Sequence, residues 1–357
     1  MQRGMPENAR QGSPASATVL PRSAAAGRAS DLDAARGLGI MLVVYGHAAR
    51  GLIASGILGN GVVVQAVDHA IYAFHMPLFF LLSGLFANQS RSKGVPLFLR
   101  SRLVTIVYPY LLWSLVQGGA TLAVAGVVNH PETPGALLAI GWQPIAQFWF
   151  LYALLLCQLV LLPPRALTVP CGIALFAAAW LAPGGSILAV AGAEFPFFAA
   201  GLLLGHRRMS ALLADRPTSW MLLAGSWLIF FALLLSPVEV AAVSLYACGL
   251  AGTVGTVAAG RLLAGQRWLC VLGAATMPIF LLHVLVGGAA RAAMLWLVPD
   301  SLPSPQAMVV LISLLGLIVP IIIARIAGRL GVSQWLGFGR PVRPIVPAVA
   351  APGGKPC

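Results

Sequence analysis

Residues 36–50 read RGLGIMLVVYGHAAR, an apolar run that begins and ends at an arginine and contains one histidine. Such a run is typical of a helix that crosses a membrane. Arg36 and His47 are eleven residues apart, about three helical turns, so they share one helix face about 16 Å apart along the axis. If Arg36 lies at the interface, His47 lies near the bilayer midplane. An ionisable side chain at that depth usually faces a protein interior or a wet cavity.

The whole chain has the composition of an integral membrane protein. Of its 357 residues, 59% are hydrophobic and only 9% are charged, and the mean hydropathy is +0.90. A soluble domain carries about a quarter charged residues, so this chain cannot cover itself with a solvated surface. The apolar runs suit membrane helices, and they lack the alternation of barrel strands. The expected fold class is an all-α, polytopic bundle of transmembrane helices.

Ten apolar segments are candidate membrane spans. The fifth is the shortest, and residues 290–299 could extend the ninth. Most basic residues fall in alternate connections, with Arg50 and Arg291 the exceptions, so the positive-inside tendency predicts that both termini are cytoplasmic. The ten segments are 37–57, 70–88, 103–128, 145–162, 168–183, 186–205, 219–236, 238–259, 269–289 and 306–328.

Three regions follow from this pattern. Residues 1–30 are predicted to be a disordered basic tail, residues 31–328 a ten-span membrane domain, and residues 329–357 a Pro-rich cytoplasmic tail. The longest outer loops are expected near 58–69, 129–144 and 290–305. Gly201 and Gly205 have the spacing of closely packed helices.

Two partner classes are not expected. The formal net charge is +13, but the positive residues lie in short connections between apolar runs, so no nucleic acid is expected to bind. The five cysteines lack metal-ligand spacing, and neither His47 nor His75 has a carboxylate or thiolate at ligand spacing. No metal site is therefore expected.

Polar residues in and beside the first two spans have local roles. Pro77 should break the second span next to His75, and a broken helix at membrane depth is tolerated where it lines a cavity. Asp33 lies three residues before Arg36 and can pair with it. Either Asp31 or Asp33 can cap the first helix.

Each intramembrane polar residue also has a purely structural interpretation. A histidine can bond to a neighbouring helix, and arginines at helix ends, such as Arg100 and Arg102, are typical interfacial anchors. Glu194 lies well inside the sixth span and His283 inside the ninth. The sequence assigns neither of these two a role.

Five segments together resemble acyltransferase family 3, a family of membrane proteins, over roughly residues 30–325. The most specific element is the pair Arg36 and His47, with ten residues between them, and Phe79, Phe80, Ser83 and Gly84 support it. The stretch FHMP (74–77) around His75 is most similar to the fucose 4-O-acetylase-like branch of the family. The segments are DLDAARGLGIMLVVYGH (31–47), FHMPLFFLLSGL (74–85), SRLVTIVYPYLLW (101–113), FWFLYALL (148–155) and MPIFLLH (277–283).

This resemblance implies an enzyme of the membrane, expected in a bacterial cytoplasmic (inner) membrane. It implies transfer of an acyl group, usually acetyl, from cytoplasmic acyl-CoA to a hydroxyl of a cell-surface glycan or lipid-linked sugar. It also implies that Arg36 and His47 are catalytic. Many members carry an Arg-x-x-Arg pair at the third span, where this chain has Arg102 but Thr105 at the second position.

Physical chemistry suggests how the candidate residues divide the work. The phosphates of CoA are too charged for hydrocarbon, so Arg36, Arg100 and Arg102 are expected to bind them at the cytoplasmic mouth. Burial favours a neutral His47, which could act as a general base or carry the acyl group.

The remaining candidates would bind the acceptor or hold it in place. His75 or Ser83 could orient His47 or the substrate. Arg50, three residues beyond His47, could meet an acceptor that enters from the outer side.

Other functions fit parts of this pattern. Intramembrane His and Arg with a Pro-broken helix also suit a proton-coupled transporter or exporter of a glycan or lipid, although no internal repeat is evident. A different donor, such as succinyl-CoA, is compatible with the same residues. A non-catalytic membrane scaffold is a further alternative.

Overall fold

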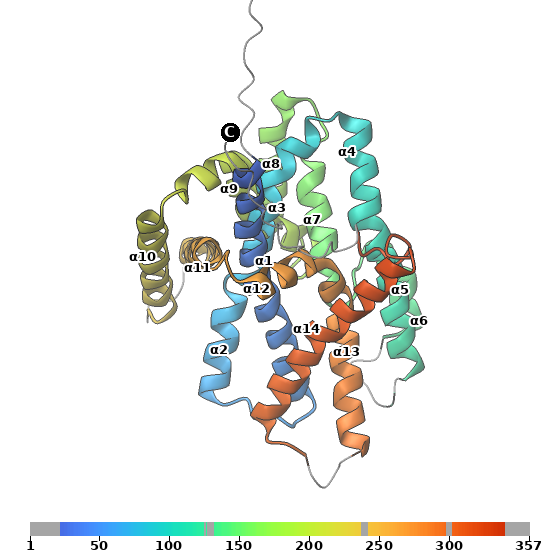
Figure 1. Cartoon of the computed structure of the whole chain (residues 1–357). Helices are drawn as coiled ribbons and strands as arrows, with labels where there is room; N and C mark the ends of the chain where they lie inside the picture. Colours follow the sequence, from blue (N-terminus) through green and yellow to red (C-terminus); the bar gives the residue numbers. More distant parts are fainter. Residues whose placement is uncertain (1–21, 125, 127–131, 237–241, 298–301, 340–357) are drawn as a thin grey trace, which may run out of the picture.

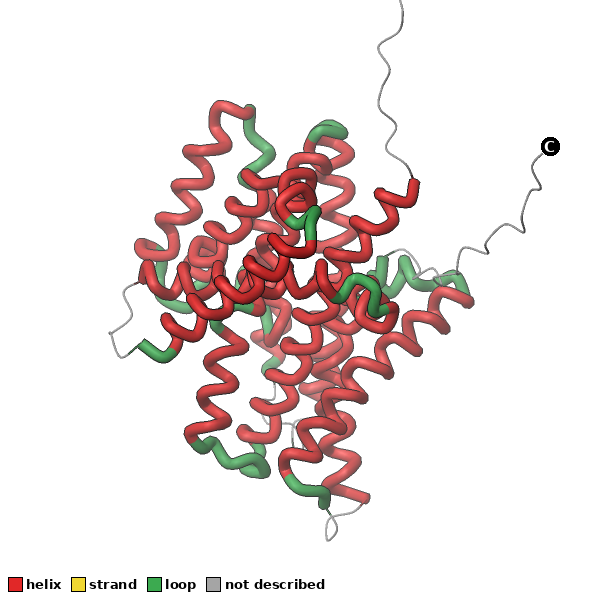
Figure 2. Tube along the Cα trace, turned by 60° about the vertical axis from the view of Figure 1, so that its left-hand side comes forward, coloured by secondary structure: helices red, strands yellow, loops and turns green. Residues whose placement is uncertain are grey.

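The computed structural model describes residues 22–124, 126, 132–236, 242–297 and 302–339. Within these ranges the chain is helical without a strand, which confirms the all-α fold class (Figures 1 and 2). The helices are α1 (Arg22–Ala54), α2 (Val62–Tyr72), α3 (His75–Arg91), α4 (Val95–Arg102), α5 (Tyr108–Ala123), α6 (Pro134–Leu138), α7 (Trp149–Leu159), α8 (Arg165–Leu181), α9 (Ile187–Leu212), α10 (Arg216–Leu234), α11 (Ala242–Leu262), α12 (Arg267–Ala274), α13 (Thr276–Leu297) and α14 (Pro305–Arg329).

Nine helical segments of the described chain are long and apolar enough to cross a membrane. The expected span 168–183 corresponds to α8, an apolar helix of 17 residues that falls below this length. At 1.5 Å per residue it is about 26 Å long, slightly short of a ~30 Å hydrocarbon core. The even number of spans and the cytoplasmic side of the termini therefore remain predictions.

Helix α1 begins within the segment expected to be a tail. Asp31 and Asp33 therefore lie inside the helix, and the prediction that one of them caps it is wrong. The predicted pairing of Asp33 with Arg36 is confirmed by a 2.7 Å ion pair. Asp31 instead faces Arg261 of α11 at 3.5 Å.

The expected second span is two helices. α2 ends at Tyr72 and α3 begins at His75, so the predicted break beside His75 is confirmed. Pro77 is the third residue of α3, where an α-helix has no internal acceptor for the missing N–H. α2 also occupies most of residues 58–69, which were expected to form an outer loop.

Proline shapes the third span in a different way. Pro109 has no N–H to offer the carbonyl of Thr105, and its ring crowds that carbonyl. Residues Leu103–Val107 widen into a π-helical segment that joins α4 to α5. The third span is therefore one continuous apolar segment in sequence, but in the structure it consists of the π-helical segment and α5.

The ninth expected span is also divided. The chain leaves α12 after Ala274 and re-enters a helix at Thr276, two residues before Pro278. α13 then continues to Leu297, so it includes most of residues 290–299, which the sequence left as a possible extension.

Small residues allow the helices to approach closely. A Cβ on Gly84 of α3 would overlap the carbonyl of Phe198 in α9, and a Cβ on Gly201 would overlap the carbonyl of Leu81. The predicted close packing at Gly201 is therefore confirmed. Gly205 instead has φ +66° at a kink in α9, with open space around its Cβ position.

Helix α1 is the centre around which the site is built. It packs against α3, α11, α12, α13 and α14 (Figure 1). Gly37 lies against the Leu269 carbonyl of α12, and Gly273 of α12 lies against the carbonyl of Asp33. These contacts enclose the N-terminal half of α1 and hold the Arg36 turn in place.

Residues 330–339, at the start of the expected C-terminal tail, pack on α5. The Tyr108 hydroxyl donates to the Trp335 carbonyl at 2.6 Å, and Trp113 Nε1 donates to the Leu336 carbonyl at 2.9 Å. The buried ring of Phe338 stacks on Trp113. This segment is thus part of the packed structure.

Candidate active site

A cavity of about 440 Å³ lies beside the N-terminal part of α1. Three cations from different segments line it: Arg36 of α1, Lys93 of the turn after α3, and Arg102 at the end of α4. Ser83 and Ser90 add hydroxyl groups. We call this space the basic cavity, and its charge suits a phosphate-bearing ligand.

The two arginines of the basic cavity are held by neighbouring side chains. The guanidinium of Arg36 pairs with Asp33 and lies 5.7 Å from the centre of the Phe86 ring. Arg102 donates to the Ser90 hydroxyl, and its buried Nε has no hydrogen-bond partner among the described residues. Within the described residues, Arg102 therefore retains a donor without a protein acceptor.

The structure brings only some of the expected donor-binding residues together. Arg36 and Arg102 line the basic cavity, but Arg100 is exposed on α4 and does not line it. Lys93 lines the cavity and Arg100 does not. In the sequence, Lys93 is only one of several basic residues in the connections. Thr105 donates to the Ser101 carbonyl at 2.7 Å on an exposed face, away from the cavity lining.

Ser83 lies in the basic cavity and accepts a hydrogen bond from Gln158 at 3.1 Å. It follows His75 by eight residues in α3, about 12 Å along the helix axis. Ser83 is therefore near Arg36 and not beside His75. An orienting role of either residue toward His47 stays a prediction.

His47 packs against a second imidazole. Its ring centre lies 5.0 Å from that of His283 in α13, with the planes at 67°. His283 Nδ1 faces the carbonyl oxygens of Phe280 and Ile279 at 2.9 and 3.0 Å. Because carbonyls only accept, Nδ1 carries the hydrogen, and Nε2 of the neutral ring holds the lone pair. That Nε2 is buried and has no hydrogen-bond partner among the described residues.

His75 is the third imidazole of the site. It is buried, and its Nδ1 donates to the Ile71 carbonyl at 2.8 Å across the break between α2 and α3. The centre of its ring lies 4.5 Å from that of Tyr72, with the ring planes at 80°. His47 is partly exposed, and it lies between the ring of His283 in α13 and, three residues further along α1, Arg50.

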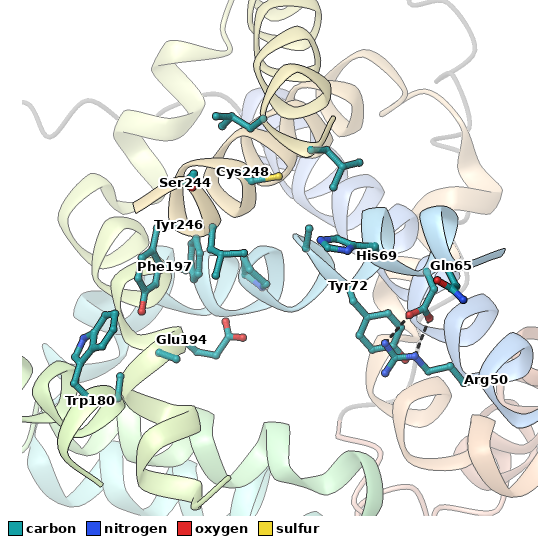
Figure 3. Close-up of a pocket in the computed structure, with 18 of the residues that line it drawn as sticks. Arg50, Gln65, His69, Tyr72, Trp180, Glu194, Phe197, Ser244, Tyr246 and Cys248 are labelled. Atoms are coloured by element: carbon teal, nitrogen blue, oxygen red, sulfur yellow. Dashed lines mark hydrogen bonds and ion pairs between the residues drawn. The ribbon is translucent and has the colours of Figure 1, made fainter. Parts of the chain in front are cut away.

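A second cavity, of about 880 Å³, lies near the C-terminal part of α1 (Figure 3). Arg50, Tyr72 and Gln65 form one side, and Glu194 and Tyr246 face them from the other. Because its walls combine hydrogen-bonding groups with aromatic rings, we call it the polar-aromatic cavity.

Arg50 is held by a carboxylate that the sequence analysis did not select. Its Nε and Nη2 donate to the two carboxylate oxygens of Asp68 at 2.7 and 2.8 Å. Its guanidinium also lies 3.2 Å from the centre of the Tyr72 ring. The sequence predicts an outer loop at 58–69, which includes Asp68. The helical pattern of residues 62–72, which form α2, is the signal that could have indicated that Asp68 faces Arg50.

The three candidate positions on α1 follow one another along the helix. Arg36 lines the basic cavity and Arg50 lines the polar-aromatic cavity, while His47 lines neither of them. His47 lies three residues from Arg50, about 4.5 Å along the axis, and about 16 Å from Arg36. A single helix thus connects both cavities to the imidazole pair.

No cluster of three or more His, Cys, Asp or Glu side chains that could hold a metal occurs in the described part of the chain. The imidazole nitrogens of His75 and His283 that face carbonyl oxygens are donors and not ligands.

Comparison with known proteins agrees with the resemblance noted in the sequence. The nodulation protein NolL of Mesorhizobium japonicum is 30% identical over 126 residues, which are 34% of this chain and 32% of that protein. NolL of Sinorhizobium fredii is 30% identical over 127 residues, 34% of this chain and 33% of that protein. The match thus spans about a third of the length of these curated relatives. No solved structure matches the chain.

The family assignment rests on a longer match than these. A family model described as an acyltransferase domain matches residues 30–325. This range includes both cavities' residues on α1 and the imidazole pair of His47 and His283. The chain therefore belongs to acyltransferase family 3, a family of membrane enzymes that transfer acyl groups.

Proposed function

We propose that this protein is a membrane O-acyltransferase that moves an acetyl group from cytoplasmic acetyl-CoA to a hydroxyl of a glycan or lipid-linked sugar, in a bacterial inner membrane. One observation carries the proposal. Helix α1 bears a basic cavity at Arg36 and a polar-aromatic cavity at Arg50, with His47 and its partner imidazole between them. Two chemically different cavities suit a donor and an acceptor that meet from opposite ends.

The donor end suits CoA. Phosphates are anionic and bind best to paired guanidinium and ammonium donors. Arg36, Lys93 and Arg102 supply three such cations around one cavity, and Arg102 Nε remains without a protein partner among the described residues. The acyl-CoA supplies the thioester, and the pantetheine arm is uncharged, so it can enter between helices more easily than the phosphates.

The chemistry at His47 is a proton transfer coupled to attack on a carbonyl. A neutral imidazole accepts the proton of the acceptor hydroxyl, the oxygen attacks the thioester carbon, and the C–S bond breaks as the C–O bond forms. The imidazolium then returns the proton to the departing thiolate, so the enzyme is unchanged. His283 packs on His47 and limits its orientation. Covalent relay of the acyl group through His47 has the same overall balance.

The test uses purified protein in liposomes with acyl-labelled acetyl-CoA and a glycan and glycolipid extract of the source cells. We expect label in alkali-labile esters on sugar. We expect His47→Ala and His47→Gln to lose at least a hundredfold in rate, because general acid–base catalysis contributes ~10²–10⁴. Tyr45→Phe is the matched control, since Tyr45 lies on the exposed face of the same helix.

Full activity of both His47 variants would remove His47 from the mechanism. Glycan or lipid uptake into the vesicles without acylation would instead identify a transporter. Labelled product with succinyl-CoA but not with acetyl-CoA would retain the transferase and correct the donor.

A further inference from the structure

The polar-aromatic cavity contains a carboxyl group to which the chemistry above assigns no role. Glu194 of α9 lines the cavity and points toward its interior (Figure 3). Its Oε2 is buried and has no hydrogen-bond partner among the described residues. A buried carboxyl that the protein leaves incompletely bonded is costly, and a ligand that donates hydrogen bonds offsets that cost.

The wall beside Glu194 is aromatic. The rings of Phe197 and Tyr246 lie side by side, with their centres 5.7 Å apart, and both line the cavity. Trp180 lines it as well and is 61% exposed. Such rings offer flat apolar faces that match the C–H face of a sugar ring, while the carboxyl accepts bonds from its hydroxyl groups.

The charge of the cavity does not favour a phosphate-like ligand. The one arginine of its lining, Arg50, is neutralised by a bidentate pair with Asp68. Glu194 adds a carboxyl group and no cation. The polar-aromatic cavity therefore differs chemically from the basic cavity, which has three cations in its lining.

The size of the cavity and its position relative to His47 favour the same ligand. A volume of about 880 Å³ is within the ~300–1,000 Å³ range of small-molecule sites and exceeds the needs of one sugar ring. Tyr72 lies between this cavity and the imidazoles, because its ring contacts Arg50 on one side and His75 on the other. The Arg50 wall of the cavity is thus within one turn of His47 along α1.

We infer that the polar-aromatic cavity binds a neutral sugar ring, with Glu194 accepting hydrogen bonds from its hydroxyl groups and Phe197, Tyr246 and Trp180 packing on its apolar face. Its use as the acyl acceptor rests on the proposed function, but the binding itself does not.

The binding experiment uses the full-length protein in nanodiscs without acetyl-CoA. Methyl glycosides of glucose, galactose, fucose and N-acetylglucosamine are the probes, and saturation-transfer NMR measures their binding. We expect at least one to bind, and Glu194→Ala to weaken its affinity about threefold to tenfold, which corresponds to the net value of a lost hydrogen bond. Glu194→Gln keeps the shape and should weaken binding less.

The control is Glu132→Ala, the same change at a carboxylate outside the cavity lining. The methyl glycoside of glucuronic acid tests the charge argument and should bind more weakly than that of glucose. Failure of all four neutral probes to bind the wild-type protein overturns the inference, as does equal affinity for wild-type and Glu194→Ala protein.

Kinetics separate this inference from the proposed function. If the protein transfers acetyl to a probe, Glu194→Ala should raise the acceptor KM about tenfold and leave the KM for acetyl-CoA unchanged. Sugar binding that depends on Glu194 without any acyl transfer retains the site and overturns the transferase. Acyl transfer with an unchanged acceptor KM in Glu194→Ala retains the transferase and overturns the site.

Discussion

At the residue scale, His283 is the group that distinguishes His47 from an ordinary helix-packing histidine. Two carbonyl oxygens fix the hydrogen on His283 Nδ1. The Nε2 of this buried ring next to His47 then has no hydrogen-bond partner in the part of the chain that the structure describes. Sequence order could not reveal this pair, because the two residues are 236 positions apart. His283 ends one of the family-like segments, MPIFLLH (277–283), but the resemblance implies no role for it.

We expect His283→Phe, which keeps a ring in the same space, to lower kcat about tenfold, because a misplaced catalytic group costs rate without costing affinity. The KM values for donor and acceptor should stay within twofold. The pH profile of kcat should also change, which a merely structural role would not produce. A wild-type pH profile together with a wild-type kcat would remove His283 from the mechanism.

The arginines make a second prediction at this scale. Arg102 lines the basic cavity and Arg100, two residues earlier, is exposed. We expect Arg102→Gln to raise the KM for acetyl-CoA about tenfold, since charge-assisted bonds to phosphate are strong. Arg100→Gln is the matched control and should change it less than twofold. Equal effects of the two variants would show that surface charge, and not the cavity, attracts the donor.

At the scale of elements, the helix crossing of α3 and α9 positions the site. Gly84 and Gly201 lie at this crossing, each against a carbonyl of the other helix. Ser83 of the basic cavity and Glu194 of the polar-aromatic cavity lie on these same two helices. Any separation of α3 from α9 therefore disturbs both cavities.

We expect Gly84→Ala to destabilise the protein by roughly 1–3 kcal/mol, the usual cost of overpacking. Thermal unfolding in detergent, followed by tryptophan fluorescence, measures this. Gly119→Ala in α5 is the control, because nothing lies within 4 Å of its Cβ position. A Gly84→Ala protein as stable as Gly119→Ala would mean that the crossing relaxes without cost.

Proline breaks explain where element prediction succeeded and where it failed. Pro77 predicted the break between α2 and α3, because its ring is incompatible with a continuous hydrogen-bonded helix through this position. The π-helical segment before Pro109 was not predicted, since hydropathy does not distinguish 3.6 from wider turns. Asp31 and Asp33 resembled helix caps, but α1 begins earlier and uses them as ion-pair partners.

At the scale of the whole molecule, the two cavities lie toward opposite ends of the candidate span Asp31–Ala54 of α1. Arg36 and Arg50 are fourteen residues apart, about 21 Å along the helix axis. In the proposed function, this separation places the donor near Arg36 and the acceptor near Arg50 on one continuous helix. It also makes the sidedness of the reaction a property that can be measured.

In vesicles of one orientation, we expect acetyl-CoA to be consumed only when it is added on the side of Arg36. CoA phosphates do not cross hydrocarbon, so acetyl-CoA on the other side should remain intact. Protein orientation is determined with a cysteine-reactive impermeant label on an added N-terminal cysteine. Equal consumption from both sides of sealed vesicles contradicts the two-ended arrangement.

Hydropathy and spacing along the chain determined that this is a helical membrane protein, because an uncharged surface can be stable only in lipid. They also determined that Arg36 and His47 share a face of α1, because helical periodicity is a local property. Only the tertiary structure decided that Lys93 replaces Arg100, that Asp68 neutralises Arg50, and that His283 meets His47. Those contacts join segments far apart in sequence, and their geometry depends on how helices cross and where prolines and glycines bend them.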